Sequence, residues 1–196
     1  MGDFPVATAE LSGVPLATRS SFVREAWRAW VRVYALLWAF TLGSCVLVLV
    51  VPGGPAFARA MLPLTLTGAH NPPPSLAGVL SIAANNTLRS VWPLTLGLID
   101  AQRRLVTRLL ADGAVLGNLL VSGLLVGGAI GGYGIQMLAF LPHLPLEWGG
   151  LAIGAAGWAV DRERRVVGGG KGLALILSAG TLLCAAMIET HIAPHR

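Results

Sequence analysis

Residues 109–130 read LLADGAVLGNLLVSGLLVGGAI, and this stretch decides the fold class because it carries a single charged residue, Asp112. A run of about 20 apolar residues is long enough to cross the hydrocarbon core of a bilayer as a helix. Four further runs of this kind cover residues 31–51, 76–99, 141–160 and 172–192. The sequence therefore predicts an all-α, polytopic membrane helix bundle with about five transmembrane helices.

The composition agrees with a membrane protein. Of the 196 residues, 55% are hydrophobic and 12% are charged, and the mean hydropathy is +0.71. Soluble domains are usually about 25% charged. We expect residues 1–29 to form a cytosolic tail and residues 30–196 to form the transmembrane bundle. The first residues include Asp3 and Glu10 and lack the basic start and apolar run of a secretory signal.

The basic residues predict the orientation of the bundle. Most of the 14 Lys and Arg residues precede the first run or lie between the second and third runs or the fourth and fifth. These are Arg19, Arg24, Arg28, Arg32, Arg103, Arg104, Arg108, Arg162, Arg164, Arg165 and Lys171. Since basic residues gather on the cytoplasmic side, we expect the N-terminus inside and the C-terminus outside. The same placement accounts for the net charge of +5, so no nucleic-acid partner is expected.

A few polar residues interrupt the apolar runs, and the predicted orientation brings them all to the outer leaflet. They are Asn85, Asn86, Arg89, His143, Glu147, Glu189 and His191. Polar groups inside a membrane are costly and usually face a partner or a cavity. In the cytosolic half we expect charges only in the loops. The sequence therefore predicts one polar site near the outer face.

These residue types suit metal or acid–base chemistry. His143 and Glu147 are four apart and share a face of one helix, unless Pro145 prevents it, and Glu189 would be a third ligand for Zn²⁺ or another divalent cation. His191 lies about 200° around the helix from Glu189, so it joins them only if the helix frays. A bound metal would activate water, and without metal either glutamate could act as a general base.

The remaining polar groups would support catalysis. Asn86 and Arg89, with Asn85 in support, could stabilise a developing oxyanion. Structural alternatives remain open: Glu147 could favour the start of a helix, Glu189 could pair with Arg89, and the asparagines could join helices by hydrogen bonds.

Several familiar signatures are missing. The sequence contains no HExxH, GxSxG, P-loop or GxGxxG pattern, so we expect no nucleotide cofactor. Cys45 and Cys184 lie in apolar runs and predict buried small side chains, with a disulfide as the alternative if their helices touch. Gly113, Gly117, Gly123, Gly127 and Gly131 predict close helix packing, either within the bundle or between copies in a homo-oligomer.

Three sequence pieces resemble the stage II sporulation protein M family. They are Asn85-Asn86-Thr87-Leu88-Arg89, Leu141-Pro142-His143-Leu144-Pro145-Leu146-Glu147 and Ile188-Glu189-Thr190-His191-Ile192-Ala193-Pro194. The resemblance covers about residues 25–194. Leu144 stands where the family has glycine, which puts the geometry of the helix start in doubt. Asp112-Gly113 stands where the family has asparagine-glycine, which places a carboxylate where an amide is usual.

The resemblance implies a multi-pass protein of the bacterial cytoplasmic membrane and two kinds of role. One is maturation of a hydrophobic peptide precursor, by leader cleavage, head-to-tail cyclisation or both, as for circular bacteriocins; the chain would then be a metal-dependent intramembrane peptidase or cyclase. The other is a non-catalytic scaffold that recruits a peptidoglycan hydrolase or an ABC exporter. A transporter component is a third alternative. The Ala-, Gly- and Arg-rich composition, typical of a high-GC bacterium, favours peptide maturation.

Overall fold

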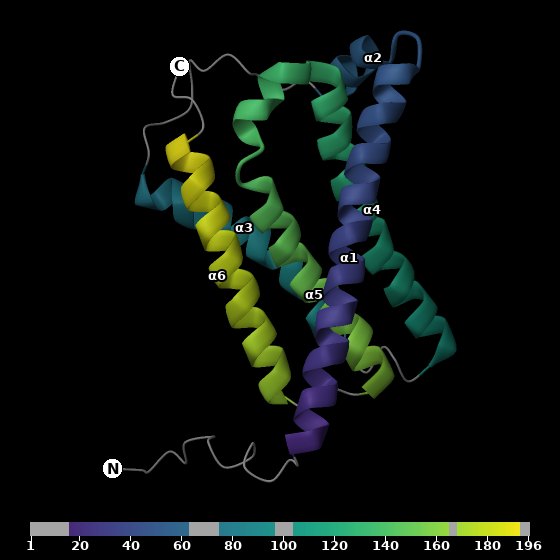
Figure 1. Ribbon diagram of the computed structural model, residues 1–196, viewed down its shortest axis with the longest axis vertical. Coiled ribbons are helices and arrows are strands. Elements are labelled where there is room, and N and C mark those ends of the chain that lie inside the picture. The colour runs from purple at the N-terminus through teal and green to yellow at the C-terminus, as the bar shows by residue number, and fades with distance from the viewer. Residues whose placement is uncertain (1–15, 63–74, 97–103, 165–167, 193–196) are drawn as a thin grey trace.

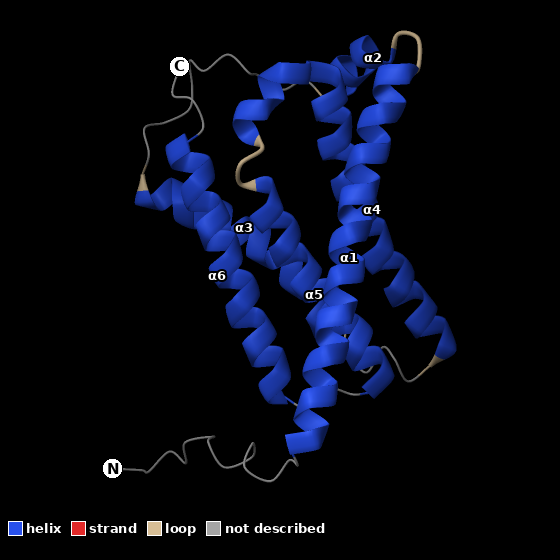
Figure 2. Cartoon of the chain, viewed as in Figure 1, coloured by secondary structure: helices blue, strands red, loops and turns tan. Residues whose placement is uncertain are grey.

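The computed structural model describes residues 16–62, 75–96, 104–164 and 168–192, and within these residues the chain is all-helical (Figure 2). The helices, in chain order, are α1 (Leu16–Val50), α2 (Gly54–Met61), α3 (Leu76–Thr95), α4 (Leu105–Tyr133), the 3₁₀ helix η2 (Gly134–Phe140), α5 (Leu144–Arg164) and α6 (Gly168–Ile192). The expectation of an all-α fold is confirmed.

Three of these helices contain segments long and apolar enough to cross a membrane: Val23–Val50, Leu105–Met137 and Gly170–His191. They coincide with the first, third and fifth predicted spans. The other two predicted spans correspond to α3 and α5, which have 20 and 21 residues. Both are long enough to cross a bilayer, but their polar residues, such as Arg89 and Glu147, lower their hydropathy. The structure therefore supports a membrane protein with three candidate spanning helices.

Several boundaries differ from the sequence prediction. Helix α1 begins at Leu16, inside the predicted tail, and residues 1–15 lie outside the described part of the chain. The short helix α2 follows the first span. The residue before it, Gly53, has a positive φ of 76°. Glycine suits this left-handed conformation because it has no Cβ. Helix α3 ends at Thr95, and the predicted end of the second span, at residue 99, lies outside the described residues.

The helices pack as a pair and a group of three. Helix α1 packs along α4, while α3, α5 and α6 pack on one another, and α1 also contacts α5. Figure 1 shows α1, α4 and α6 running in one direction and α3 and α5 in the other. The end of this second group where α5 begins and α6 ends holds the candidate site.

Glycine produces the close approach of α4 to α1. A Cβ on Gly127 would collide with the carbonyl oxygen of Thr41, and one on Gly131 would collide with Val48. Gly123 meets α1 in the same way, whereas Gly113 and Gly117 have open space beside them. Close packing within the bundle is therefore confirmed for the last three glycines of the series, and packing of the first two against another copy stays a prediction.

A buried polar contact ties the group of three together. Ser90 of α3 donates to the carbonyl oxygen of Gly150 in α5, and its Oγ lies 2.7 Å from Oγ of Ser178 in α6. Both serines are fully or almost fully buried. One turn along α5, Gly154 leaves room for the carbonyl oxygen of Ser90, which a Cβ would displace. These contacts fix the three helices relative to one another directly beneath the candidate site.

The opposite end of the bundle carries paired charges. Nη1 of Arg162 lies 2.6 Å from Oδ2 of Asp112, whose Oδ1 accepts a hydrogen bond from the indole of Trp158. Nζ of Lys171 lies 2.9 Å from Oδ2 of Asp161. The prediction that charges in this half lie only in loops is wrong, since Asp112 belongs to α4, and Asp161 and Arg162 belong to α5.

The two cysteines differ from their predicted burial. Cys45 in α1 is half-buried and Cys184 in α6 is exposed, and both are free thiols. Cys45 and Cys184 therefore form no disulfide in the structure.

Candidate functional site

The start of α5 places His143 and Glu147 on one face. The carbonyl oxygen of His143 accepts the backbone N–H groups of Leu146 and Glu147 at 3.0 and 3.1 Å, so His143 caps the helix. Pro145 lies in the first turn, where its missing N–H is not needed. The proline therefore starts the helix instead of separating the two side chains. Leu144, between His143 and Pro145, is buried.

Helix α6 adds the third side chain. Nε2 of His143 lies 3.8 Å from Oε2 of Glu147, and their side chains are only 12% and 19% exposed. One ligand atom from each of His143, Glu147 and Glu189 lies within 4.8 Å of the other two, and Glu189 is partly buried as well. The start of one helix and the end of another thus bring together residues that are far apart in the sequence.

Helix α3 supplies an amide that orients Glu147. Nδ2 of Asn86 donates a hydrogen bond of 2.6 Å to Oε1 of Glu147. The other carboxylate oxygen, Oε2, remains on the side of His143. Arg89, one turn further along α3, is exposed but lies within electrostatic reach of Glu147. Carboxylates that bind metals are commonly held in this way by a second hydrogen-bonding group.

Two of the predicted site residues lie apart from this cluster. Asn85 is exposed on α3. His191 is exposed on α6, and its Nδ1 lies 2.8 Å from the carbonyl oxygen of Met187 in its own helix. Helix α6 continues in regular form to Ile192, so it does not fray in the way that His191 would need to join Glu189.

The three clustered residues fit a divalent cation. Ligand atoms around a tetrahedral Zn²⁺ at about 2.0–2.1 Å lie about 3.4 Å from one another. The ligand atoms of the three residues all lie within 4.8 Å of one another, so small side-chain movements would close them around an ion. One imidazole and two carboxylates also match the charge of a divalent metal. Zn²⁺, Mn²⁺ and Fe²⁺ all accept such a mixed set of nitrogen and oxygen ligands.

Three protein ligands leave coordination positions for water and substrate. In catalytic zinc sites that open position is where a bound water becomes a nucleophile. The neighbouring Asn86 amide and Arg89 guanidinium are the kinds of group that stabilise negative charge developing on an acyl oxygen. The arrangement is therefore suited to hydrolysis or transfer at a carbonyl carbon.

The sequence reasoning missed the residues that support the site and an aromatic face elsewhere. It did not include Ser90 or Ser178, the two buried serines that join α3 and α6. It also passed over Trp27, Trp30 and Tyr34, which are three and four residues apart in α1 and stack on one another. That helical spacing was the available signal, because it places all three rings on one side of the helix.

Comparison of the chain with protein-family models, with curated proteins and with solved structures finds no match.

Proposed function

We propose that this chain is a five-span bacterial membrane protein in which His143, Glu147 and Glu189 hold a divalent metal that processes a hydrophobic peptide precursor. The N-terminus lies in the cytoplasm and the C-terminus outside, so that the site opens near the outer face. The alternating directions of α1, α3, α4, α5 and α6 support this topology (Figure 1). The clustering of basic residues supports the orientation.

One observation carries the metal site. Potential ligand atoms from the start of α5 and the end of α6 lie within 4.8 Å of one another, and Asn86 of a third helix holds one of the carboxylates. Two acidic side chains close together and partly shielded from solvent are costly unless a cation, a proton or a hydrogen-bonding group compensates for their charge. A divalent ion would compensate both carboxylates at once.

The proposed reaction is acyl transfer. In leader cleavage, water adds to the carbonyl carbon of the scissile peptide bond, the C–N bond breaks, and the departing amine takes up a proton. In head-to-tail joining, the amino terminus that leader cleavage frees attacks the C-terminal carboxyl carbon of the same peptide, the C–O bond breaks, and water leaves. With both glutamates as ligands, a bound metal would lower the pKa of the attacking water; without metal, Glu189 or Glu147 would take the proton from the nucleophile. In both cases Asn86 and Arg89 would stabilise the oxyanion.

The likeness to the stage II sporulation protein M family links this chemistry to a substrate class. Its three sequence pieces supply Asn86 and Arg89, His143 and Glu147, and Glu189. Membership would also suggest an ABC exporter or a cell-wall hydrolase as a partner. The close packing of Gly154 on Ser90 beneath the site disfavours the transporter alternative, because it leaves little room for a path through this group of helices.

Metal content tests the proposal directly. Full-length protein, purified without chelator, is analysed for Zn, Mn and Fe by mass spectrometry beside His143→Ala and Glu147→Gln, with Asp112→Asn as the control at the other end of the bundle. We expect about one metal per chain in the wild type and the control and none in the two site variants. Equal metal content in folded wild type and site variants would remove the metal site.

Processing in cells tests the reaction. The same variants replace the wild-type gene in the native bacterium, and mature and precursor peptides are measured by mass spectrometry. We expect precursor to accumulate in both site variants. Normal maturation with well-folded, metal-free variants would instead favour the non-catalytic scaffold.

A further inference from the structure

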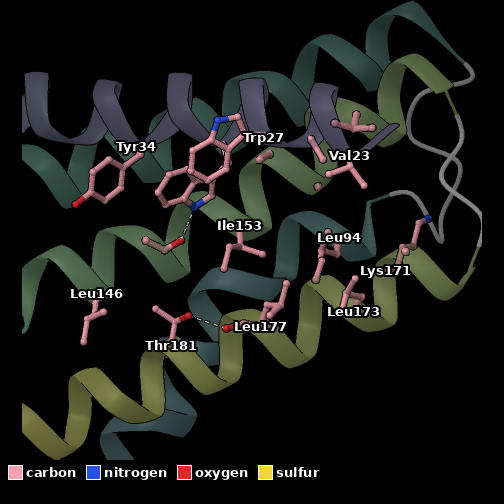
Figure 3. Close-up of a pocket in the computed structure, with 18 of the residues that line it drawn as sticks. Val23, Trp27, Tyr34, Leu94, Leu146, Ile153, Lys171, Leu173, Leu177 and Thr181 are labelled. Carbon is pink, nitrogen blue, oxygen red and sulfur yellow. Dashed lines mark hydrogen bonds between the residues drawn. The ribbon is translucent and has the colours of Figure 1, made fainter. Parts of the chain in front are cut away.

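An apolar groove runs along α5 on the side away from the metal-ligand cluster. It has a volume of about 660 Å³ and lies between α1 and α6. Figure 3 shows Trp27 and Tyr34 from α1, Ile153 from α5 and Leu177 from α6 lining it. We call it the α1/α5/α6 groove.

The groove has a charged end and an apolar body. Lys171 lines it at the start of α6, beside the start of α1, and its Nζ contacts Asp161. A lysine ammonium has three donors, so this contact leaves donors for an additional anionic oxygen. Arg24 and Arg28 of α1 are exposed on either side of Trp27 in sequence and add positive charge near the same end.

The groove is shorter than a membrane span. Its lining residues extend from Val23 to Tyr34 in α1 and from Gly170 to Thr181 in α6, which is about 16 Å in each helix at 1.5 Å per residue. In α5 they extend from Pro145 to Val160, which is about 22 Å. A transmembrane helix from a partner would need a surface of about 30 Å, whereas a lipid acyl chain ends near the bilayer centre, about 15 Å from the headgroups.

The aromatic side chains are placed as a lipid headgroup requires. Trp27 stacks on Trp30, and Trp30 stacks on Tyr34. The indole N–H of Trp30 donates to the carbonyl oxygen of Gly149, which holds the ring against α5. Tryptophan is enriched where headgroups meet acyl chains, and basic pockets between membrane helices bind anionic headgroups.

We propose that the α1/α5/α6 groove is a binding site for one anionic phospholipid, with its phosphate at Lys171 and an acyl chain along Trp30, Ile153 and Leu177. The site is distinct from the metal-ligand cluster and does not depend on the peptide-processing function. The lipid belongs to the leaflet that meets the Lys171 end of the bundle.

Tryptophan quenching tests this assignment. Full-length protein in maltoside detergent is titrated with phosphatidylglycerol brominated in mid-chain, and in parallel with phosphatidylcholine carrying the same chains. We expect saturable quenching at lower concentrations of phosphatidylglycerol, and its loss in a Trp27→Phe/Trp30→Phe variant, which removes the two groove indoles. Equal half-saturation for the two lipids would overturn the anionic assignment.

Two variants separate the acyl and headgroup contacts. Ile153→Phe should fill the groove and weaken both lipids at least tenfold, while Leu116→Phe on the exposed face of α4 should change neither. Asp161→Asn/Lys171→Gln removes both charges together, which avoids leaving one of them unpaired, and should weaken phosphatidylglycerol about fivefold with little effect on phosphatidylcholine. Unchanged binding in Ile153→Phe would contradict the proposed location.

A competition arm tests other occupants. Unbrominated phosphatidylglycerol should restore the fluorescence, whereas a Lys-flanked polyleucine helix at the same concentration should not. Stronger displacement by the helix than by the lipid would show that a hydrophobic peptide is the occupant and would overturn the proposal. Metal content, measured on the same samples, should be the same in Ile153→Phe and wild type.

Discussion

The two ends of the α3, α5 and α6 group differ in whether their acidic side chains are paired with basic ones. At one end Asp161 pairs with Lys171 at 2.9 Å, and nearby Asp112 pairs with Arg162 at 2.6 Å. At the other end two glutamates and a histidine gather within 4.8 Å, and the nearby cation, Arg89, is exposed. Each acid of the first end has a base beside it, whereas the second end carries an excess of acid.

The difference teaches which charges hold the fold and which are available for chemistry. In a matched pair between helices each charge is compensated within the chain, although the remaining ammonium donors of Lys171 can still bind an anionic oxygen. A cluster with excess negative charge can be compensated by a metal ion or a substrate. Polar residues of this kind in a membrane are more often functional than structural. Substitutions at the two ends should therefore change different properties of the protein.

The largest loss of stability is expected from Asp161→Asn. The Asp161 side chain is 4% exposed and that of Lys171 is 20% exposed, so the substitution leaves a poorly hydrated ammonium without its carboxylate. Breaking a buried ion pair in this way costs about 3–5 kcal/mol. Unfolding in detergent micelles measures the change, and Asp161→Asn/Lys171→Gln should recover much of it. A loss below about 1 kcal/mol would mean that the pair is structurally unimportant.

Glu147→Gln should act with the opposite sign on the metal-free protein. It removes one of two neighbouring negative charges and keeps an oxygen that can accept the Asn86 hydrogen bond. With both glutamates ionised, carboxylate oxygens no more than 4.8 Å apart repel each other by about 3 kcal/mol at an effective dielectric of 20, so we expect metal-free stability to rise by about 1–3 kcal/mol. Unfolding in the presence of chelator measures this gain.

The same variant should lose the metal. Glutamine is a poor substitute for a carboxylate ligand, and metal affinity should fall by more than the roughly 10–100-fold that loss of an outer hydrogen-bonding partner costs. Titration with Zn²⁺ and a competing chelator measures it. A Glu147→Gln protein that is less stable without metal and still binds Zn²⁺ normally would place Glu147 with the structural charges of the other end.

The sequence was sufficient for the residues of the site but not for the pairing at the opposite end. His143 and Glu147 are four apart, and helical geometry alone places them on one face. Glu189 could be added only through the predicted topology, which orders helix ends by membrane side. The Asp161–Lys171 and Asp112–Arg162 contacts depend on how each helix is rotated about its own axis. The sequence near these helix ends shows no periodic pattern from which that rotation could be predicted.

The groove was hidden for a related physical reason. The ring spacing of Trp27, Trp30 and Tyr34 shows that they share a face, but any apolar face of a membrane helix can pack on protein or on lipid. Only the separation of α1 from α6 along α5 leaves this face as a groove. The start of α1 at Leu16 was also missed, because Arg19, Arg24 and Arg28 make that part of the helix too polar to be counted with the span.

Asn86→Ala should have a smaller effect that remains confined to the metal end. Its amide donates to Glu147 without belonging to the metal-ligand cluster, so its loss should weaken metal binding about 10–100-fold while leaving metal bound at saturation. Asn85→Ala is the matched control, because Asn85 is the exposed neighbour on the same helix. Equal affinities in the two variants would show that the Asn86 hydrogen bond does not orient Glu147 for the metal.

The smallest effect is expected from Asp112→Asn, which also shows whether burial sets the strength of the paired charges. Arg162 and Asp112 are 36% and 28% exposed, so water compensates for much of what the substitution removes, and asparagine keeps an oxygen for the indole of Trp158. A double-mutant cycle with Arg162→Gln should give a coupling of about 0.2–1 kcal/mol, as for exposed pairs. Metal affinity should not change. A coupling free energy as large as that between Asp161 and Lys171 would mean that solvent exposure does not weaken the Asp112–Arg162 pair. The pair would then be as poorly hydrated as a pair in the interior.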